Sequence, residues 1–339
     1  MKHKKTHIIL TAGGTGGHIL PAIAVADAFK SLLGNQVELF FVGAEGKMEM
    51  NIVPQKGYEI VGLPIVGLQR RMTLKNLLFP IKWMKSIRKA KEIIRSFQPD
   101  AVIGFGGYAS APVLRAAQTY NIPTFIQEQN AFPGMVNRWL AKKTKHVFLA
   151  YPNMEHFFSP EKIKITGNPV RDVFFDLPIS QIAAKEKFGL DKEQPLVFVM
   201  GGSQGARSIN LAIKENIGYF IQQNVSLIWQ TGKWFIEEAK ALIQEKEAEH
   251  LIKPMVFIDD IHEAFAAADI VVSRAGAISI AELSAAKKPS IFVPLPIAAE
   301  DHQTKNAAQL VQAQAALMVD DKQASTKLIT MVDELLKDP

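Results

Sequence analysis

Three glycine-rich segments, each directly after a short apolar run, constrain the fold more than any other feature of the sequence. They are residues 13–17, 104–107 and 201–205, and an expected helix follows each of them. Glycine permits positive φ angles and lets the backbone approach a ligand closely. The unpaired N–H groups at a helix N-terminus stabilise phosphate oxygens. Three such strand-to-helix turns in one chain therefore favour a ligand that carries phosphate.

Strands and helices alternate along the chain, which is typical of parallel α/β architecture with right-handed crossovers. In the N-terminal half the expected strands are residues 6–10, 37–42, 57–64, 101–103, 122–126, 146–150 and 164–166. Gly and Pro punctuate residues 167–171, and the pattern restarts with a strand at 196–200. We therefore predict two Rossmann-like, doubly wound domains, residues 1–167 and 168–339, that face each other across a cleft.

The composition excludes several classes of protein. The chain has 339 residues, enough for two domains, and 48% of them are hydrophobic, which predicts packed cores. It contains no cysteine, which excludes disulfides and thiolate zinc sites. No apolar run approaches the roughly 20 residues that span a bilayer. The apolar run 8–10 passes directly into glycines, so we expect a first strand there and not a signal peptide.

The net charge of +6 conceals an asymmetry between the two halves. Residues 1–165 carry 22 Lys and Arg against 10 Asp and Glu (+12), whereas residues 166–339 carry 17 against 23 (−6). Residues 68–91 hold eight basic residues and no acidic one, interleaved with Leu, Phe, Ile, Trp and Met. This pattern is typical of an amphipathic helix packed on a sheet, and also of a patch that meets an anionic membrane surface. No RNP, zinc-finger or helix-turn-helix pattern is present, so we expect no nucleic-acid partner.

Several phosphate-binding classes do not fit the motifs. No G-x-x-x-x-G-K-[ST] occurs, which disfavours a P-loop NTPase. The first glycine loop lacks the third glycine of a dinucleotide fingerprint, and the strand at 37–42 ends without a ribose-binding acid, which disfavours a dehydrogenase. No D-x-D occurs, so we expect no metal cofactor. A leaving diphosphate would then depend on helix N-termini, hydroxyls and arginine, for which Ser203 and Arg171 are suitable in type.

Residues 273–306 combine features of a nucleotide-sugar site. Ser279 and Glu282 are three apart, so they share one side of the first turn of a helix that we expect to begin near Ser279. The polar residues beyond the next strand, at 291–293, are Glu300, Asp301, His302, Gln303 and Asn306. A helix N-terminus beside a carboxylate and amides can bind an anion and a polyol together. The alternative is a glycine-started helix followed by a solvated polar loop.

Eight motifs spread over about residues 6–320 carry a family resemblance. They are TAGGTGGHILPAIAVADAF, GFGGYASAP, EQNAFPGMVNRWLAK, GNPVR, GGSQGARSIN, FIDDI, RAGAISIAEL and DHQTKNA. In this order and spacing they resemble the MurG family of bacterial transferases. The resemblance implies a GT-B fold, UDP-N-acetylglucosamine as donor, and lipid I (undecaprenyl-pyrophosphoryl-N-acetylmuramoyl-pentapeptide) as acceptor. Members of the family usually continue into a final helix that returns to the N-terminal domain, whereas this sequence ends at Pro339.

The resemblance also implies roles for individual residues. Ile258 would meet the uracil through its backbone, and Glu282 would accept both ribose hydroxyls. The other donor-binding residues that it implies are Thr15, Gly16, Asn130, Arg171, Ser203, Ala277, Ile278, Ser279, His302 and Gln303. The acceptor-binding residues that it implies are Gly13, Gly14, Gly17, Gly104, Gly106, Gly107 and Tyr108.

The implied reaction is attack by a muramoyl 4-hydroxyl on the anomeric carbon, with inversion. His18 closes the first glycine loop and is our predicted general base, because a helix N-terminus favours the neutral imidazole. Glu128 is the second choice for the base. Another lipid glycosyltransferase, a UDP-N-acetylglucosamine 2-epimerase and a catalytically silent UDP-sugar-binding protein remain as alternatives. The resemblance further implies a peripheral position on the cytoplasmic face of the cell membrane and partners among cell-wall synthesis proteins.

Overall fold

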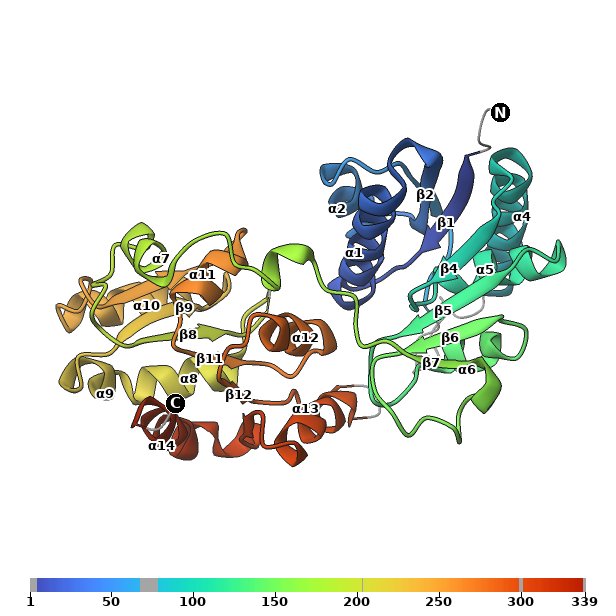
Figure 1. Ribbon diagram of the computed structural model, residues 1–339. Helices are drawn as coiled ribbons and strands as arrows, with labels where there is room; N and C mark the ends of the chain where they lie inside the picture. The colour runs from blue at the N-terminus through green and yellow to red at the C-terminus, as the bar shows by residue number, and fades with distance from the viewer. Residues whose placement is uncertain (1–4, 68–78, 203, 299–300, 338–339) are drawn as a thin grey trace. The chain divides into compact units, whose positions relative to one another are not determined.

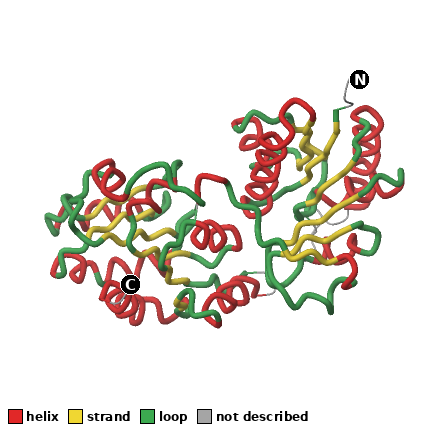
Figure 2. Tube along the Cα trace, in the orientation of Figure 1, coloured by secondary structure: helices red, strands yellow, loops and turns green. Residues whose placement is uncertain are grey.

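The computed structural model describes residues 5–67, 79–202, 204–298 and 301–337. Residue contacts divide the chain into two compact units, residues 1–171 and 172–339. Within each unit helices and parallel strands alternate along the chain, as Figures 1 and 2 show. The predicted α/β class is therefore confirmed. The contacts place the division after Arg171, a few residues later than the boundary expected after Gly167.

The first unit contains a parallel sheet in the order β3-β2-β1-β4-β5-β6-β7. Its strands are β1 (Thr6–Thr11), β2 (Val37–Ala44), β3 (Ile60–Leu63), β4 (Ala101–Gly104), β5 (Thr124–Glu128), β6 (His146–Leu149) and β7 (Ile163–Ile165). Its helices are α1 (Gly16–Leu33), α2 (Glu49–Gln55), α4 (Phe79–Phe97), α5 (Ser110–Thr119) and α6 (Met135–Ala141), with short 3-10 turns η1 (Gly34–Gln36) and η2 (Pro160–Lys162). Helices α1 and α2 contact each other, as do α4 and α5 (Figure 1).

Strand β1 is buried on both faces and separates two apolar layers. Ile8 and Leu10 pack with residues of α1, whereas Ile9 packs with residues of α4 and α5. The chain runs outward from β1 to β3 and then returns to β4 on the other side of β1. The pairing of Thr11 with Gly104 brings the ends of β1 and β4 together. Ligands of open α/β sheets bind at such a switch point, and both predicted acceptor loops follow these two strands.

The second unit contains a parallel sheet in the order β10-β9-β8-β11-β12-β13. Its strands are β8 (Leu196–Met200), β9 (Ser226–Gln230), β10 (Ile252–Met255), β11 (Ile270–Ser273), β12 (Ser290–Phe292) and β13 (Leu317–Met318). Its helices are α7 (Gln181–Lys187), α8 (Arg207–Glu215), α9 (Ile217–Gln222), α10 (Ile236–Glu245), α11 (Ile261–Ala267), α12 (Ala277–Ala285), α13 (His302–Gln312) and α14 (Ala324–Lys337), with 3-10 turns η3 (Asp172–Phe174) and η5 (Asp321–Gln323).

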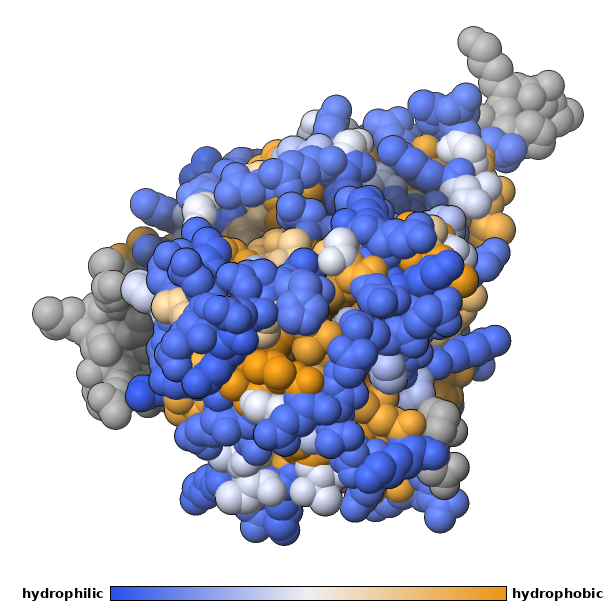
Figure 3. All heavy atoms as spheres, turned by 90° about the vertical axis from the view of Figure 1, so that its left-hand side faces the viewer, coloured by the Kyte–Doolittle hydropathy of each residue, from blue (hydrophilic) through white to orange (hydrophobic). Residues whose placement is uncertain are grey.

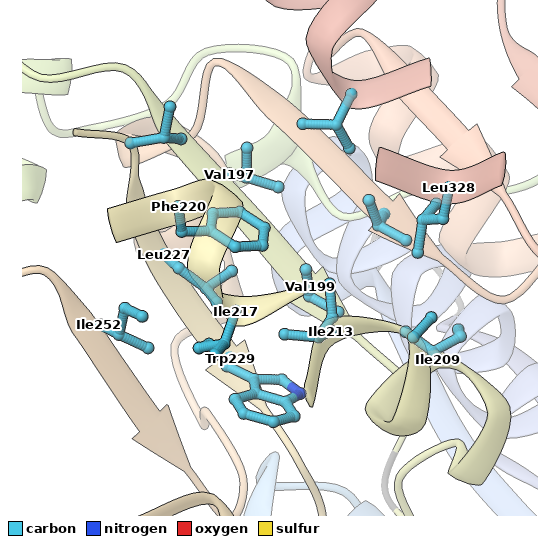
Figure 4. Packing of buried hydrophobic residues seen from close by; sticks show 14 of the residues in the cluster. Val197, Val199, Ile209, Ile213, Ile217, Phe220, Leu227, Trp229, Ile252 and Leu328 are labelled. Carbon is cyan, nitrogen blue, oxygen red and sulfur yellow. The ribbon is translucent and has the colours of Figure 1, made fainter. Parts of the chain in front are cut away.

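The main core of the second unit lies between β8, β9 and the helices α8, α9, α10 and α14. Figure 4 labels ten of its residues: Val197, Val199, Ile209, Ile213, Ile217, Phe220, Leu227, Trp229, Ile252 and Leu328. Trp229 donates its indole N–H to Oδ1 of Asn210 at 3.0 Å, and the Asn210 amide donates to the Thr231 carbonyl at 2.8 Å. This buried network fixes α8 against the end of β9. The face drawn in Figure 3 is mostly hydrophilic, with apolar residues showing between polar ones.

Candidate active site

The two predicted acceptor loops of the first unit lie against each other. A β-carbon placed on Gly107 would lie 2.2 Å from the carbonyl oxygen of Gly13, and one placed on Gly13 would lie 2.7 Å from Cβ of Ala109. Gly106 and Gly107 have φ angles of +91° and +75°, which side chains other than glycine rarely adopt. Glycine is therefore required both for the turn after β4 and for its contact with the loop after β1.

His18 lies in the first turn of α1 and is partly buried. Its Nδ1 lies 3.1 Å from Oγ1 of Thr15 and 3.2 Å from the carbonyl oxygen of Gly13. Because a carbonyl oxygen only accepts hydrogen bonds, this arrangement assigns the proton of a neutral imidazole to Nδ1. The lone pair is then on Nε2, which faces Gly106: a β-carbon there would lie 3.1 Å from Nε2. His18 thus presents a proton-accepting nitrogen between the two loops.

The ring of Tyr108 lies over the first loop. Its Cε1 would be 3.3 Å from a β-carbon on Gly14, and its Cδ1 would be 3.1 Å from one on Gly67. Burial, and secondly the negative charge of Glu49, raise the pKa of the Tyr108 phenol. Tyr108 therefore stays protonated at neutral pH and can donate a hydrogen bond to an acceptor molecule.

Glu128 is buried at the end of β5 and organises the segment that follows. One carboxylate oxygen accepts from the backbone and side-chain N–H groups of Asn130, at 3.1 and 3.3 Å. The other accepts from the Gly134 backbone at 3.1 Å and from the Asn137 amide at 2.8 Å. Burial raises the pKa of Glu128, although all four hydrogen bonds oppose that shift. Asn137 also lies near Gly106, so this network connects Glu128 to the loop that faces His18.

Hydrogen bonds hold Asn168 against other residues of the first unit. Gln127 donates to Oδ1 of Asn168 at 2.9 Å, and the Asn168 amide donates to the Gln129 carbonyl at 3.1 Å. Gln129 in turn donates to the Phe105 carbonyl at 2.7 Å. The segment before Arg171 is therefore held by the ends of β4 and β5. Arg171, the last residue of this unit, is partly buried.

In the second unit, most predicted donor residues lie at the carboxyl edge of the sheet. Helix α12 begins at Ala277, two residues earlier than the expected Ser279, after the extended residue Gly276 (φ −66°, ψ 138°). The N-cap residue Gly276 has no side chain and no acidic residue lies in the first turn, so the positive end of the helix dipole suits an anion. Glu282 is only 6% exposed, and Ile278 is also buried.

Ile258 follows β10 and is tied to the third glycine loop by a residue that the sequence analysis did not identify. The Ile258 N–H donates to Oε1 of Gln230 at 3.0 Å, and the Gln230 amide donates to the Gly202 carbonyl at 3.3 Å. Gln230 is buried at the end of β9. Because the Ile258 N–H is engaged in this bridge, a backbone contact of Ile258 with a ligand falls to its carbonyl oxygen.

Arg274 is a second organising residue that the sequence analysis did not identify. Its guanidinium donates to the carbonyls of Val293 and Pro294, at 3.0 and 3.2 Å, and to the Ser208 hydroxyl at 3.0 Å. It also pairs with Asp321. Arg274 therefore holds together the ends of β11 and β12 and the start of α8.

Of the other predicted donor residues, Thr15, Gly16 and Asn130 belong to the first unit, and His302 and Gln303 belong to the second. His302 and Gln303 begin α13, which contacts α12, and Oε1 of Gln303 accepts from the Leu295 N–H at 2.9 Å. Ser203 lies outside the described residues. Within the described ranges no three His, Asp or Glu side chains lie close enough to hold a metal ion. No helix in that part of the chain is long and apolar enough to cross a bilayer.

Models of two protein families match the chain. The glycosyltransferase family 28 N-terminal domain matches residues 8–149, and the glycosyltransferase family 28 C-terminal domain matches residues 196–339. Both predicted acceptor loops and His18 lie in the first match. Gln230, Ile258 and Glu282 lie in the second.

Individual relatives extend this likeness over nearly the full chain. The chain is 48% identical over 336 residues to the UDP-N-acetylglucosamine–N-acetylmuramyl-(pentapeptide) pyrophosphoryl-undecaprenol N-acetylglucosamine transferase of Cytophaga hutchinsonii, which covers 99% of this chain and 89% of that protein. The crystal structure of Acinetobacter baumannii MurG matches with a TM-score of 0.75 at 27% identity, over 98% of this chain and 91% of that one. A UDP-GlcNAc 2-epimerase from Neisseria meningitidis shares the fold alone, with a TM-score of 0.66 at 16% identity, over 98% of this chain and 93% of that one. The predicted GT-B fold is thereby confirmed, and the chain belongs to the MurG family of N-acetylglucosamine transferases.

Proposed function

We propose that this protein transfers N-acetylglucosamine from UDP-N-acetylglucosamine to the 4-hydroxyl of N-acetylmuramic acid in lipid I, and so forms lipid II for peptidoglycan synthesis. The observation that carries the proposal is 48% identity, over 99% of the chain, to a relative named for this transfer. Fold likeness alone could not choose between a transferase and an epimerase, because both share it. The full-length identity favours the transferase.

His18 is the general base in this proposal. The muramoyl 4-hydroxyl gives its proton to Nε2, and its oxygen attacks the anomeric carbon from the side opposite UDP. The C–O bond to UDP breaks with inversion from α to β, and UDP leaves with the electron pair. Glu128 is less suited to this role, because its buried carboxylate already accepts four hydrogen bonds from its own loop.

Most of the proposed donor contacts come from the second unit. The Glu282 carboxylate accepts hydrogen bonds from the ribose hydroxyls, and the Ile258 carbonyl accepts a hydrogen bond from uracil. The N-terminus of α12, Arg171 and Ser203 stabilise the charge that develops on the leaving diphosphate. The other donor contacts fall to Thr15, Gly16, Asn130, His302 and Gln303.

The acceptor pyrophosphate is held by the paired glycine loops. The Gly14 N–H already donates to Glu49. The pyrophosphate contacts therefore fall to the first turn of α1 at Gly16 and Gly17 and to the loop 104–108.

A transfer assay tests the proposed function. Radiolabelled UDP-N-acetylglucosamine and a short-chain lipid I analogue should give a β-linked disaccharide product, with no product when the acceptor is omitted. Consumption of the donor without an acceptor would indicate an epimerase. Donor binding without any turnover would indicate a silent UDP-sugar-binding protein, and transfer only to another lipid would indicate a different glycosyltransferase.

We further propose that α4 places the protein on an anionic membrane surface. Residues 68–78 of the basic segment lie outside the described residues, but α4 covers the rest. Ser86, Ala90 and Ile94 bury one face of α4 in the unit, whereas Ile81 and Met84 are 54% and 72% exposed among lysines and arginines. One face of α4 thus packs against the first unit, and the opposite face is exposed and carries both apolar and basic side chains.

Helix α6 extends this outer face. The rings of Trp83 and Trp139 lie 6.0 Å apart, and Trp139 is 50% exposed. Met135, one helical turn before Trp139, is 72% exposed. Aromatic side chains beside basic ones suit the lipid headgroup region. A peripheral position at the cytoplasmic membrane face, beside other cell-wall synthesis proteins, is consistent with a lipid-linked acceptor.

Vesicle binding checks this assignment. We expect Ile81→Gln to weaken binding to phosphatidylglycerol vesicles about five-fold, because roughly 1 kcal/mol of apolar burial is lost. Ile182→Gln is the matched control, because Ile182 is 53% exposed but lies on α7 of the second unit. Raising the salt concentration should weaken binding of the unsubstituted protein. Equal binding to neutral vesicles would contradict the electrostatic contribution.

A further inference from the structure

We propose that Glu49 is a positioning residue for the His18 base and acts through the peptide unit that joins Gly13 to Gly14. The carbonyl of that peptide accepts the His18 Nδ1–H at 3.2 Å, and its N–H donates to Oε2 of Glu49 at 3.2 Å. The carboxylate, the peptide and the imidazole therefore form one continuous chain of hydrogen bonds. The proposal rests on His18 being the base, and it goes beyond that role by naming what orients and polarises it.

The carboxylate of Glu49 is firmly placed. It is only 1% exposed, and its other oxygen accepts from the Ala44 N–H at 2.9 Å. Glu49 is also the first residue of α2, where the helix dipole favours a negative charge. A buried carboxylate needs such donors, and here two backbone N–H groups supply them.

Two glycines make the space that this carboxylate occupies. A β-carbon on Gly43 would lie 2.5 Å from Cγ of Glu49, and one on Gly13 would lie 2.8 Å from Oε1 of Glu49. Any larger residue at either position would push the carboxylate away from the Gly13–Gly14 peptide. Gly13 therefore permits both the contact with Glu49 and the contact with Gly107.

The effect of Glu49 on His18 follows from the direction of the hydrogen bonds that connect them. A carboxylate that accepts the peptide N–H draws positive charge toward that hydrogen and makes the carbonyl at the other end a stronger acceptor. The stronger acceptor holds the proton on Nδ1 and stabilises the imidazolium that forms when Nε2 takes the hydroxyl proton. No proton moves to Glu49, and the imidazolium later releases its proton to solvent.

Other titratable groups also lie near His18. Tyr108 packs over Gly14 and is close enough to Glu49 for its phenol to respond to that charge. Glu128 lies behind Asn137, which shares the space beside Gly106 with the imidazole. A pH profile alone would therefore mix several groups, so the test needs a signal that belongs to His18.

The test compares Glu49→Gln with Glu45→Gln, which makes the same exchange at an exposed residue four positions earlier that pairs with Lys89. The imidazole nitrogens are ¹⁵N-labelled, and the His18 signals are identified by their loss in His18→Ala. We expect the unsubstituted protein and Glu45→Gln to hold the Nδ1–H tautomer. In Glu49→Gln the Nε2–H form should become populated, the titration midpoint of His18 should fall, and kcat should drop on the order of ten-fold, less than the loss of the base itself.

Further variants separate the outcomes. Glu49→Asp keeps the charge and should recover the Nδ1–H form at least in part, whereas a purely structural role would not follow the charge. An Nε2–H tautomer in the unsubstituted protein would overturn the proposal even if every variant failed to fold. Unchanged tautomer and kcat in a folded Glu49→Gln would overturn it while the transferase assignment stands. Absence of any transfer by the unsubstituted protein would instead contradict the proposed function.

Discussion

His18→Ala is expected to lower kcat for transfer to the lipid I analogue on the order of 10²- to 10⁴-fold, with the KM for UDP-N-acetylglucosamine changed by no more than about two-fold. The reason is that, in the proposed reaction, Nε2 takes the hydroxyl proton in the transition state, whereas the nucleoside contacts proposed for Ile258 and Glu282 lie in the second unit. Steady-state kinetics with saturating acceptor measures both constants. A variant that keeps most of its kcat would remove His18 as the base and direct attention to Glu128.

The His18 imidazole can also be displaced by a substitution at a neighbouring residue, without replacing His18 itself. In Gly106→Ala the new β-carbon would lie 3.0 Å from Cδ2 and 3.1 Å from Nε2 of His18, so the imidazole must move. Gly46→Ala is the matched control, because Gly46 also has a positive φ of +68° but no atom within 4 Å of its β-carbon position. Both substitutions strain the backbone, by about 1 kcal/mol. Only Gly106→Ala should lower kcat strongly, and an equal loss in both variants would contradict the assigned position of His18.

Glu282→Gln is expected to weaken UDP binding on the order of ten- to a hundred-fold. Hydrogen bonds to a charged group are worth about 1.5–3 kcal/mol, and an amide has one acceptor oxygen where the carboxylate has two. Titration calorimetry with UDP measures the loss. The exposed Glu245→Gln, in α10 of the same unit, is the control for the exchange itself and should bind UDP normally.

An analogue of the nucleotide shows whether the ribose is the partner of Glu282. If it is, 2′,3′-dideoxy-UDP should bind the unsubstituted protein and Glu282→Gln with similar, weak affinity. The losses of binding free energy caused by the substitution and by the missing hydroxyls would then not be additive, which indicates a direct interaction between them. A full additional loss with the dideoxy analogue would show that Glu282 acts elsewhere, and it would remove the ribose assignment.

Local chemistry explains what could be predicted from the sequence. The loops at 13–17 and 104–107 were predicted because tight turns with positive φ require glycine, whatever the rest of the fold. The alternation of strands and helices then indicated a parallel sheet, and the switch point between β1 and β4 brings both loops together. Helix α12 was predicted to begin near Ser279 and begins at Ala277, because Gly276 already supplies the extended residue before the helix.

The organising residues could not be predicted in the same way. Glu49 is 35 positions from Gly14, and its partners are backbone N–H groups, which carry no sequence signal. Gln230 bridges Ile258 and Gly202 across 28 positions on each side, and it too bonds only to backbone. An isolated polar residue within or beside an expected strand or helix gives no indication that it will be buried. Only the folded structure shows which groups are its hydrogen-bond partners.

The close contact between Gly13 and Gly107 has a consequence for the timing of catalysis. Every hydrogen bond described for His18, Glu49 and Glu128 joins residues of the first unit, and the paired loops leave little space for them to shift. The proposed base is thus preorganised when the chain folds, and neither substrate is needed to assemble it. We therefore expect reorganisation of the proposed acceptor site to contribute little to the activation barrier in each catalytic cycle.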